Sequence, residues 1–343
     1  MSDPTPEQVS RAAAVTRWYL DLYHDTPDDV GVARMFTDRG RVGHFSVTED
    51  ALRVGDAEAL FRVLMATVMF QRRQDLQIMR VLQGISAADA AELSSHSALL
   101  ARADSTPCAC LRTNGALLSG CDLRKEAGVG ACLVAPEVAC SLKRHAVLLK
   151  RYGHFGKVPT SLALNLRHWG VFSLPELRKR AIGDTDTPAA AAEALERMLC
   201  GAWRVSDKIA AMYLSMLANP DLCPGIAPWS EGLDWTRWVV VDSNVDLFLG
   251  WLGYAGLGTY AARRAFITSL ATPIDLAAIK PGLASFNPRI VQQAAYLFMS
   301  VTNRKALSRD CSRVVGACGE CPEVVRGGCG ARRPGGNFAG RPG

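Results

Sequence analysis

The sequence predicts an all-α protein that forms one large or two medium-sized domains. Apolar residues recur at three- and four-residue spacings along most of the chain, whereas no segment alternates apolar and polar residues as a half-buried strand does. Of the 343 residues, 49% are hydrophobic, and the charged residues form no blocks. A chain of this length and composition can bury a sizeable core.

The first helix is expected at residues 6–24. Residues 56–82, DAEALFRVLMATVMFQRRQDLQIMRVL, carry helical apolar spacing over many turns. Four further helical segments are predicted at 141–151, 159–169, 174–182 and 187–200. The last residues, 331–343, have no apolar periodicity and predict a disordered basic tail.

Composition also excludes some classes of protein. The N-terminal segment MSDPTPEQVSRAAAV has neither a basic region nor an apolar region of the kind found in signal peptides. The longest apolar run, VLMATVMF, is too short to span a bilayer. We therefore expect a cytoplasmic protein with no membrane partner. The net charge of +6 is compatible with a polyanionic partner but does not require one.

Four cysteines near the C-terminus have the spacing of metal ligands. Cys311, Cys318, Cys321 and Cys329 follow the pattern C-x6-C-x2-C-x7-C on a glycine-containing segment. Four convergent thiolates suit either tetrahedral zinc or a four-iron cluster. Zinc sites usually contain two short C-x2-4-C pairs, and here only the middle pair is short, which favours an iron–sulfur cluster. The alternative is a chance grouping of four thiols.

A second group of cysteines lies in residues 105–140, a glycine-rich segment that we interpret as an insertion. Five thiols of this segment are candidate ligands of a second metal: Cys108, Cys110, Cys121, Cys132 and Cys140. Their wide spacing matches no site that we can assign, and small buried thiols are common in protein cores. Both interpretations stay open.

Residues 199–217, LCGAWRVSDKIAAMYLSML, predict a helix, a tight turn and a second helix. Lys208 lies at the start of the second helix, where free backbone N–H groups and nearby Arg204 favour a phosphate. Farther along, Asp242 follows three valines and precedes a predicted helix, as an N-cap residue does. Taken locally, Lys208 is a solvated charge and Asp242 is a helix cap.

The order of these features resembles the helix-hairpin-helix DNA glycosylase superfamily, in particular its endonuclease III-like members with a [4Fe–4S] cluster. The resemblance covers most of the chain. The hairpin motif G-x-G-x-K-x-A of that family places its lysine on Lys208 and its alanine on Ala210, with Arg204 and Ser206 standing where the family has glycines. The catalytic aspartate falls on Asp242, within VVVDSNV, and the cluster loop falls on CGECP.

The resemblance implies two helical domains. Residues 1–50 would be N-terminal helices that pack with the C-terminal domain. Residues 51–235 would form a six-helix barrel with the insertion 105–140 and the hairpin 195–217. Residues 236–330 would form the C-terminal helical domain, whose loop 311–329 holds the cluster, followed by the tail 331–343.

The resemblance also implies a reaction and a partner. A monomeric, nucleoid-associated enzyme would flip a damaged or modified base out of double-stranded DNA and cleave its N-glycosidic bond. Lys208 would attack the sugar and form a Schiff base that permits AP lyase cleavage, and Asp242 would stabilise the developing positive charge. The base is left open. Two other classes also remain: an inactive DNA-binding relative of this fold, and a metal-cluster protein unrelated to repair.

Several side chains are predicted to contact DNA. Arg204 and Ser206 lie in the hairpin, and the segment MFQRRQDLQIM resembles a family turn that fills the gap left by an extruded base. The basic aromatic stretch 143–159, KRHAVLLKRYGHFGKVP, offers charges for phosphates and rings for unstacked bases, or forms a solvated helix end. The predicted contacts are Arg204, Ser206, Gln71, Arg72, Lys150, Arg151 and, in the cluster loop, Arg313 and Arg326.

Overall fold

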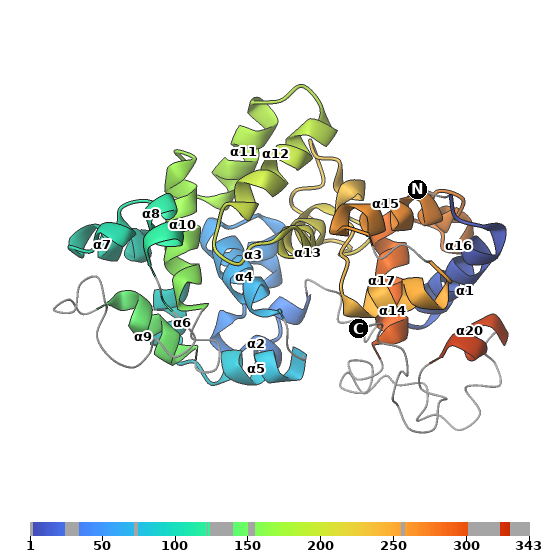
Figure 1. Ribbon diagram of the computed structural model, residues 1–343, viewed down its shortest axis with the longest axis horizontal. Helices are drawn as coiled ribbons and strands as arrows, with labels where there is room; N and C mark the ends of the chain where they lie inside the picture. The colour runs from blue at the N-terminus through green and yellow to red at the C-terminus, as the bar shows by residue number, and fades with distance from the viewer. Residues whose placement is uncertain are drawn as a thin grey trace. The chain divides into compact units, whose positions relative to one another are not determined.

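The all-α fold class is confirmed for the part of the chain that the structure describes (Figure 1). The computed structural model describes residues 3–24, 34–71, 75–121, 123, 140–149, 155–254, 258–300 and 323–329. Within these ranges every regular element is an α-helix or a short 3-10 helix, and there is no strand. No helix in these ranges is long and apolar enough to cross a membrane.

The chain divides into two compact units, which are described separately. The terminal unit contains residues Met1–Asp29 and Thr236–Gly343, and the central unit contains Val30–Trp235. Residues 30–50, which we expected to accompany the N-terminal helices, belong instead to the central unit. Their short helix α2 (Arg39–Val42) packs against α5 (Asp75–Gln83), a helix of the central unit, and this contact holds them in that unit.

Helix α4 (Ala57–Met69) is the centre of the central unit. It contacts α6 (Ala87–Ser94), α10 (Val158–His168), α11 (Leu174–Gly183) and α13 (Asp207–Ala218). Ten of its 13 residues are buried. A helix with this many buried apolar residues is stable only when other helices cover most of its surface, as they do here. Tyr213 of α13 donates a buried hydrogen bond to the Leu60 carbonyl of α4 at 3.0 Å.

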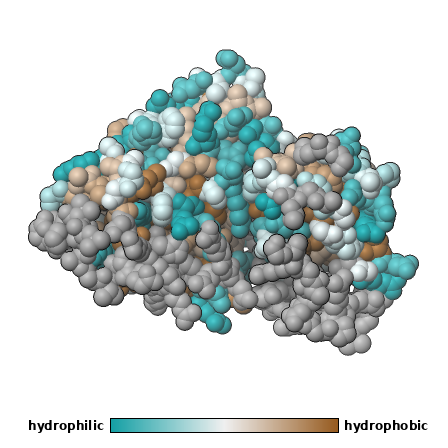
Figure 2. All heavy atoms as spheres, in the orientation of Figure 1, coloured by the Kyte–Doolittle hydropathy of each residue, from teal (hydrophilic) through white to brown (hydrophobic). Residues whose placement is uncertain are grey.

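Helix α12 (Pro188–Cys200) begins where the sequence supplies a cap. Thr187 accepts a hydrogen bond from the Ala190 backbone N–H, and Pro188 opens the helix, which packs beside α11. On the face shown in Figure 2, hydrophilic residues gather at the end of these two helices, over their connecting turn. The remaining helices are η1 (Arg34–Phe36), η2 (Gly43–Phe45), α3 (Glu49–Arg53), α7 (His96–Ser105), η3 (Ala109–Leu111), α8 (Asn114–Gly120) and α9 (Ser141–Leu148).

The terminal unit is built around α17 (Pro288–Met299). This helix contacts α1 (Pro6–Leu22), α14 (Ser243–Trp251) and α15 (Tyr260–Ala271), so the first helix of the chain packs with elements near its end. The ring of Phe298 lies 5.4 Å from Trp18 and 5.6 Å from Trp251, measured between centroids. Three short elements complete the described residues: η5 (Trp235–Arg237), α16 (Leu276–Ile279) and α20 (Glu323–Gly328).

Residues 56–82, whose apolar spacing predicts helical structure, form two helices, α4 and α5. Helix α4 ends at Phe70, whose ψ of 60° is not helical, and α5 begins at Asp75. The ring of Phe70 packs edge-on against Phe36 at 6.1 Å. Residues 71–75, QRRQD, are all polar, so the apolar spacing is interrupted where α4 ends.

A buried histidine joins three helices of the central unit. His145 of α9 is fully buried, and its Nε2 lies 3.2 Å from Glu92 Oε1 of α6. Arg144 and Arg102, from α9 and α7, also pair with Glu92. Burial lowers the pKa of His145 to about 4, although the Glu92 carboxylate opposes this shift. The imidazole is therefore neutral in the folded protein at neutral pH.

We expect this histidine to make folding stability depend on pH. Because its pKa is depressed in the folded state, the unfolded chain takes up a proton between about pH 6.5 and 4 that the folded protein does not, and stability falls as pH drops through this window. His145→Gln keeps a polar partner for Glu92 but cannot titrate. Its stability should fall less steeply over the window, by up to about 1.4 kcal/mol per pH unit, in chemical unfolding at several pH values. Equal slopes for both proteins would contradict the assignment.

Candidate functional site

The predicted helical hairpin is present in the central unit. Helix α12 ends at Cys200, Gly201 follows as its C-cap, and α13 begins at Asp207 after the N-cap residue Ser206. Both helices hold their apolar sides in the core, where Leu195, Leu199 and Ile209 are buried. The turn between them, residues 201–206, is therefore held from both ends.

Arg204 adopts a backbone conformation that favours glycine. Its φ is 66°, the only positive φ at a non-glycine residue in the described part of the chain. For an L-amino acid this costs on the order of 1–2 kcal/mol, so the surrounding structure must impose it. The position is one of the two at which the hairpin motif has glycine. Gln71, at the end of α4, donates from Nε2 to the Arg204 carbonyl at 2.8 Å.

Three buried polar side chains form hydrogen bonds with the turn, or with the helix end before it, from the core of the central unit. Asn114 of α8 donates to the Gly201 carbonyl at 2.8 Å and accepts from the Ser161 hydroxyl at 2.8 Å. The Ser161 oxygen in turn accepts from the Trp203 backbone N–H at 2.7 Å. Asn165 donates to the Met198 carbonyl at 2.8 Å. Because backbone groups of the turn have no helical partners, these side chains satisfy them inside the core.

Gly201 is required by this network. A Cβ atom at this position would lie 2.6 Å from Asn165 Oδ1, closer than any real contact. Sequence reasoning missed Asn114, Ser161 and Asn165. For Ser161 and Asn165 the available signal was that they are small polar residues in the largely apolar part of α10, where the structure buries both. Asn114 had no such signal.

Cationic and aromatic side chains cover the same turn. The Arg204 guanidinium carbon lies 5.2 Å from the Trp203 ring centroid and 5.6 Å from that of Phe155. Lys157 Nζ lies 4.7 Å from the Trp203 centroid and donates to the Cys121 carbonyl. Contacts of a cation with a ring face are each worth about 0.5–1 kcal/mol, and more when desolvated. These four side chains give the turn a fixed arrangement.

Lys208 is half-buried in the first turn of α13. Ser206, the N-cap residue, is exposed, and its side chain makes no capping hydrogen bond. The first backbone N–H groups of α13 therefore receive no hydrogen bond from the Ser206 side chain. Together with Lys208 they form a helix end that favours an anion. Burial raises the pKa of the neighbouring Cys200 thiol to about 12, with Asp207 and Glu196 adding to the shift. The protonated thiol donates to Asp207 Oδ1 at 3.6 Å.

Asp242 is the N-cap of α14, as its local sequence predicts. One carboxylate oxygen accepts from the backbone N–H groups of Asn244 and Val245, both at 3.0 Å. The Tyr260 hydroxyl donates to the Val239 carbonyl and accepts from the Val241 N–H, which fixes the chain before the cap. The second carboxylate oxygen of the half-buried Asp242 takes no part in the cap. Lys208 belongs to the central unit and Asp242 to the terminal unit.

Several predicted positions lie outside the described residues, and the structure does not test them. They are Arg72, Cys132, Lys150, Arg151, Cys311, Arg313, Cys318, Cys321 and the tail 331–343. Of the cluster loop, Arg326 lies in the last turn of α20 and half-buried Cys329 follows that helix. Among the described residues, no three His, Cys, Asp or Glu side chains gather as ligands of a metal.

The upstream cysteines lie around one hydrophobic cluster. Cys108, Cys121 and Cys140 pack against the buried core formed by Leu111, Leu117 and their neighbours. Cys110 is buried, and its sulfur lies 3.2 Å from the point where a Cβ on Gly120 would be. None of these four cysteines forms a disulfide with another described residue. Packing as small apolar side chains is the role that the described geometry supports.

The basic aromatic stretch contributes to the site differently from the prediction. Lys157, expected as a phosphate contact, is only 3% exposed and lies over Trp203. Arg144 pairs with Asp89 and Glu92. A phosphate cannot reach a lysine whose ammonium is buried, so the charge at 157 stabilises the hairpin turn. The sequence pattern of charge next to rings does not distinguish contact within the chain from contact with a ligand.

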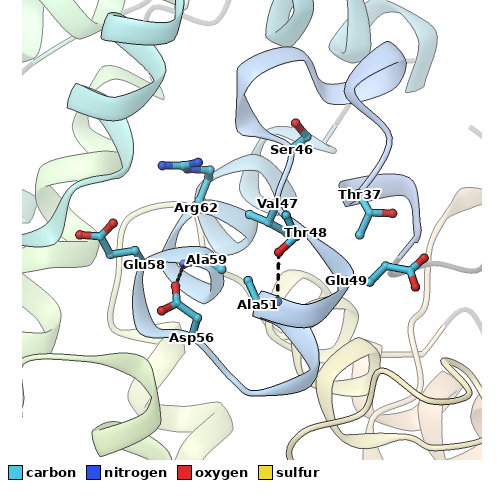
Figure 3. A pocket seen from close by; sticks show the side chains of 10 residues that line it. All are labelled: Thr37, Ser46, Val47, Thr48, Glu49, Ala51, Asp56, Glu58, Ala59 and Arg62. Carbon is cyan, nitrogen blue, oxygen red and sulfur yellow. Dashed lines mark hydrogen bonds between the residues drawn. The ribbon is translucent and has the colours of Figure 1, made fainter.

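A separate open groove of about 580 Å³ lies beside the start of α4 (Figure 3). Asp56 and Thr48, which line it, accept hydrogen bonds from the Ala59 and Ala51 backbone N–H groups and so cap α4 and α3. Glu49 and Glu58 add two more carboxylates, against a single cation, Arg62. An acidic lining repels a phosphate backbone, so this groove is not an extension of the hairpin surface.

Comparisons of the chain with protein-family models, with curated proteins and with solved structures found no match.

The buried polar network is testable through stability. Asn114→Ala removes the partner of the Gly201 carbonyl and of the Ser161 hydroxyl, leaving both buried. We expect the free energy of unfolding to fall by about 2–3 kcal/mol. Ser119→Ala, on the exposed side of the same helix, is the matched control and should change it by less than about 0.5 kcal/mol. Similar small effects of both substitutions in urea unfolding would show that the network does not stabilise the turn.

Proposed function

We propose that this protein is a DNA glycosylase of the helix-hairpin-helix type, which excises a damaged or modified base and cleaves the strand through a lysine Schiff base. The observation that carries the proposal is the hairpin turn. Arg204 occupies a glycine position of the motif and adopts a φ of 66°, so the turn keeps a glycine-like backbone without glycine. Other residues of the chain maintain this strained geometry, which supports a role for the turn itself.

A second contact supports the same proposal. Gln71 was predicted, from the resemblance, to fill the gap left by an extruded base, and the hairpin to bind the backbone of the same DNA. These segments are separated by 133 positions, yet Gln71 donates to the Arg204 carbonyl at 2.8 Å. Two parts of one proposed DNA surface thus lie next to each other.

The proposed surface binds DNA chiefly through phosphate. The N-terminus of α13, exposed Ser206 and Lys208 present N–H, hydroxyl and ammonium donors at a helix end. The guanidinium of Arg204 adds positive charge beside the Trp203 ring. Contacts of this kind hold any DNA sequence, so the specificity for a base must come from other side chains.

The proposed chemistry uses two side chains. After the nucleotide leaves the helix, Lys208 as a free amine attacks C1′ of the sugar, and the bond to the base breaks with the base as leaving group. The C1′–O4′ bond of this adduct then breaks, with its electron pair going to O4′, and the open sugar is a Schiff base of Lys208 that permits β-elimination of the strand. Asp242, through the carboxylate oxygen that the cap does not use, stabilises the positive charge that develops on the sugar.

The finer architecture belongs to this proposal as well. The central unit would be the six-helix barrel, and the terminal unit would carry a [4Fe–4S] cluster held by Cys311, Cys318, Cys321 and Cys329. The cluster would organise a loop in which Arg313 and Arg326 face the DNA backbone. Of the four ligands only Cys329 is described, and no step of the proposed reaction passes through the cluster.

One observation favours a second candidate, a DNA-binding protein of this fold that has lost catalysis. The Asp242 carboxylate is already engaged as a helix cap, a role that requires no chemistry. Measuring base release from a panel of lesion-bearing duplexes separates the two candidates. A protein unrelated to repair would show no salt-dependent DNA binding.

The Schiff base can be trapped. Borohydride present during turnover should link the protein covalently to DNA, and Lys208→Gln should abolish the adduct while binding to duplex DNA persists. Lys179→Gln, an exposed lysine of α11, is the matched control and should leave trapping unchanged. Base excision by Lys208→Gln at the wild-type rate would instead make the lysine a phosphate contact and the enzyme monofunctional.

Substitutions of Asp242 separate its cap from its chemistry. Asp242→Asn keeps an oxygen for the cap but loses the charge, so base excision should fall by about 100-fold or more with little change in stability. Asp242→Ala should in addition lower the free energy of unfolding by about 1 kcal/mol. The control is Asp275→Asn, which alters the cap of α16 in the same unit and should not affect excision. Wild-type excision by Asp242→Asn would overturn the proposed function.

A further inference from the structure

Gln71 uses both of its amide hydrogens within the protein. Its Nε2 donates to the Val68 carbonyl at 2.7 Å and to the Arg204 carbonyl at 2.8 Å. Backbone carbonyls only accept hydrogen bonds, so these contacts require the amide nitrogen, and not the amide oxygen, to face them. A primary amide has two N–H bonds, and the two carbonyls occupy both. Filling a gap in a DNA duplex would require the side chain to leave both partners.

The backbone of Gln71 is also held. Its N–H donates to the Met69 carbonyl at 2.7 Å, directly after the point where α4 ends. The side chain therefore starts from the end of a buried helix and reaches a turn that is 133 positions away in the sequence. The last carbonyls of an α-helix have no helical donors, so the bond to Val68 also satisfies one of these groups. Gln71 thus joins the end of α4 to the hairpin turn.

The second bond of Gln71 falls on a strained residue. Arg204 has a φ of 66°, and the orientation of its carbonyl, which accepts from Gln71, depends on the backbone angles of the same residue. A hydrogen bond to that carbonyl therefore opposes relaxation of Arg204 into the right-handed region. The net free energy of one hydrogen bond and the cost of one left-handed residue are of the same order. One contact of this kind offsets much of the strain.

The conformation of this turn matters because α13 begins directly after it. Ser206 is the N-cap residue of α13, and Lys208 lies in its first turn. The backbone from Arg204 to Ser206 leads into the N–H groups that form the anion-favouring helix end. A change of φ at residue 204 redirects this backbone, and with it the approach of the turn to a phosphate.

We propose that Gln71 is a positioning residue of the hairpin. It holds Arg204 in the left-handed conformation and so presents the turn to a DNA phosphate, without entering the duplex itself. The effect on DNA rests on the proposed function. The effect on the turn does not, because it is a property of the free protein and is measured without DNA.

The full-length protein without DNA is tested first. Gln71→Met keeps the length of the side chain and removes both donors, so amide hydrogen exchange of residues 201–206 should be about tenfold faster by mass spectrometry. Gln77→Met, at an exposed glutamine of α5, is the matched control and should exchange as the wild type does. Unchanged exchange in Gln71→Met would overturn the proposal.

Arg204→Gly separates a hold on residue 204 from a general role at the end of α4. Glycine adopts a φ of 66° without strain, so in this background Gln71→Met should speed exchange by less than about twofold. The same acceleration in both backgrounds would mean that Gln71 only completes the helix end, which contradicts the proposal. If Gln71→Met alone folds poorly, comparing Arg204→Gly with the double variant still decides the question.

Duplex DNA tests the second half of the proposal. Gln71→Met should weaken binding about five- to tenfold and leave the excision rate at saturating DNA unchanged, and the loss should be absent in the Arg204→Gly background. A slower excision rate at saturating DNA with unchanged hydrogen exchange would make Gln71 a side chain that enters the duplex, contrary to the proposal. Absence of salt-dependent binding by the wild type would refute the proposed function, whereas the exchange measurements would still decide whether Gln71 holds the turn.

Discussion

The burial of α4 is the constraint on which the central unit depends. Ten of its 13 residues are buried, so α6, α10, α11 and α13 pack around it and remove most of it from water. Its C-terminal end then becomes a fixed point. Gln71 follows the last turn of this helix and contacts the hairpin. One hydrophobic helix thus positions the residue that holds the turn to which we assign a function.

The hairpin turn shows how a strained backbone is maintained. Arg204 holds a positive φ that most residues avoid, and the turn between α12 and α13 leaves backbone groups without helical partners. Asn114 and Ser161 satisfy these groups from inside the core, and Gly201 leaves room for Asn165. A half-satisfied network of this kind would be worse than an apolar core, and here the bonds connect the turn to α8 and α10.

Asp242 illustrates how one side chain can serve structure and chemistry together. Its cap uses one oxygen for two backbone N–H groups, which leaves the second oxygen for another partner. A carboxylate fixed in this way loses little conformational entropy when it meets a developing positive charge, which favours electrostatic catalysis. The same geometry also satisfies a purely structural role. Function must therefore be decided by substitutions that keep the cap and remove the charge.

The helical class, the helices of the hairpin and the Asp242 cap were determined by the sequence alone, because apolar spacing and capping residues act within a few neighbouring positions. The assignment of residues 30–50 to the central unit and the buried position of Lys157 depended on tertiary structure. Each results from contacts between residues far apart in the chain, such as α2 with α5 or Lys157 with Trp203. Patterns among neighbouring residues do not depend on such contacts, so these features could be determined only from the folded structure.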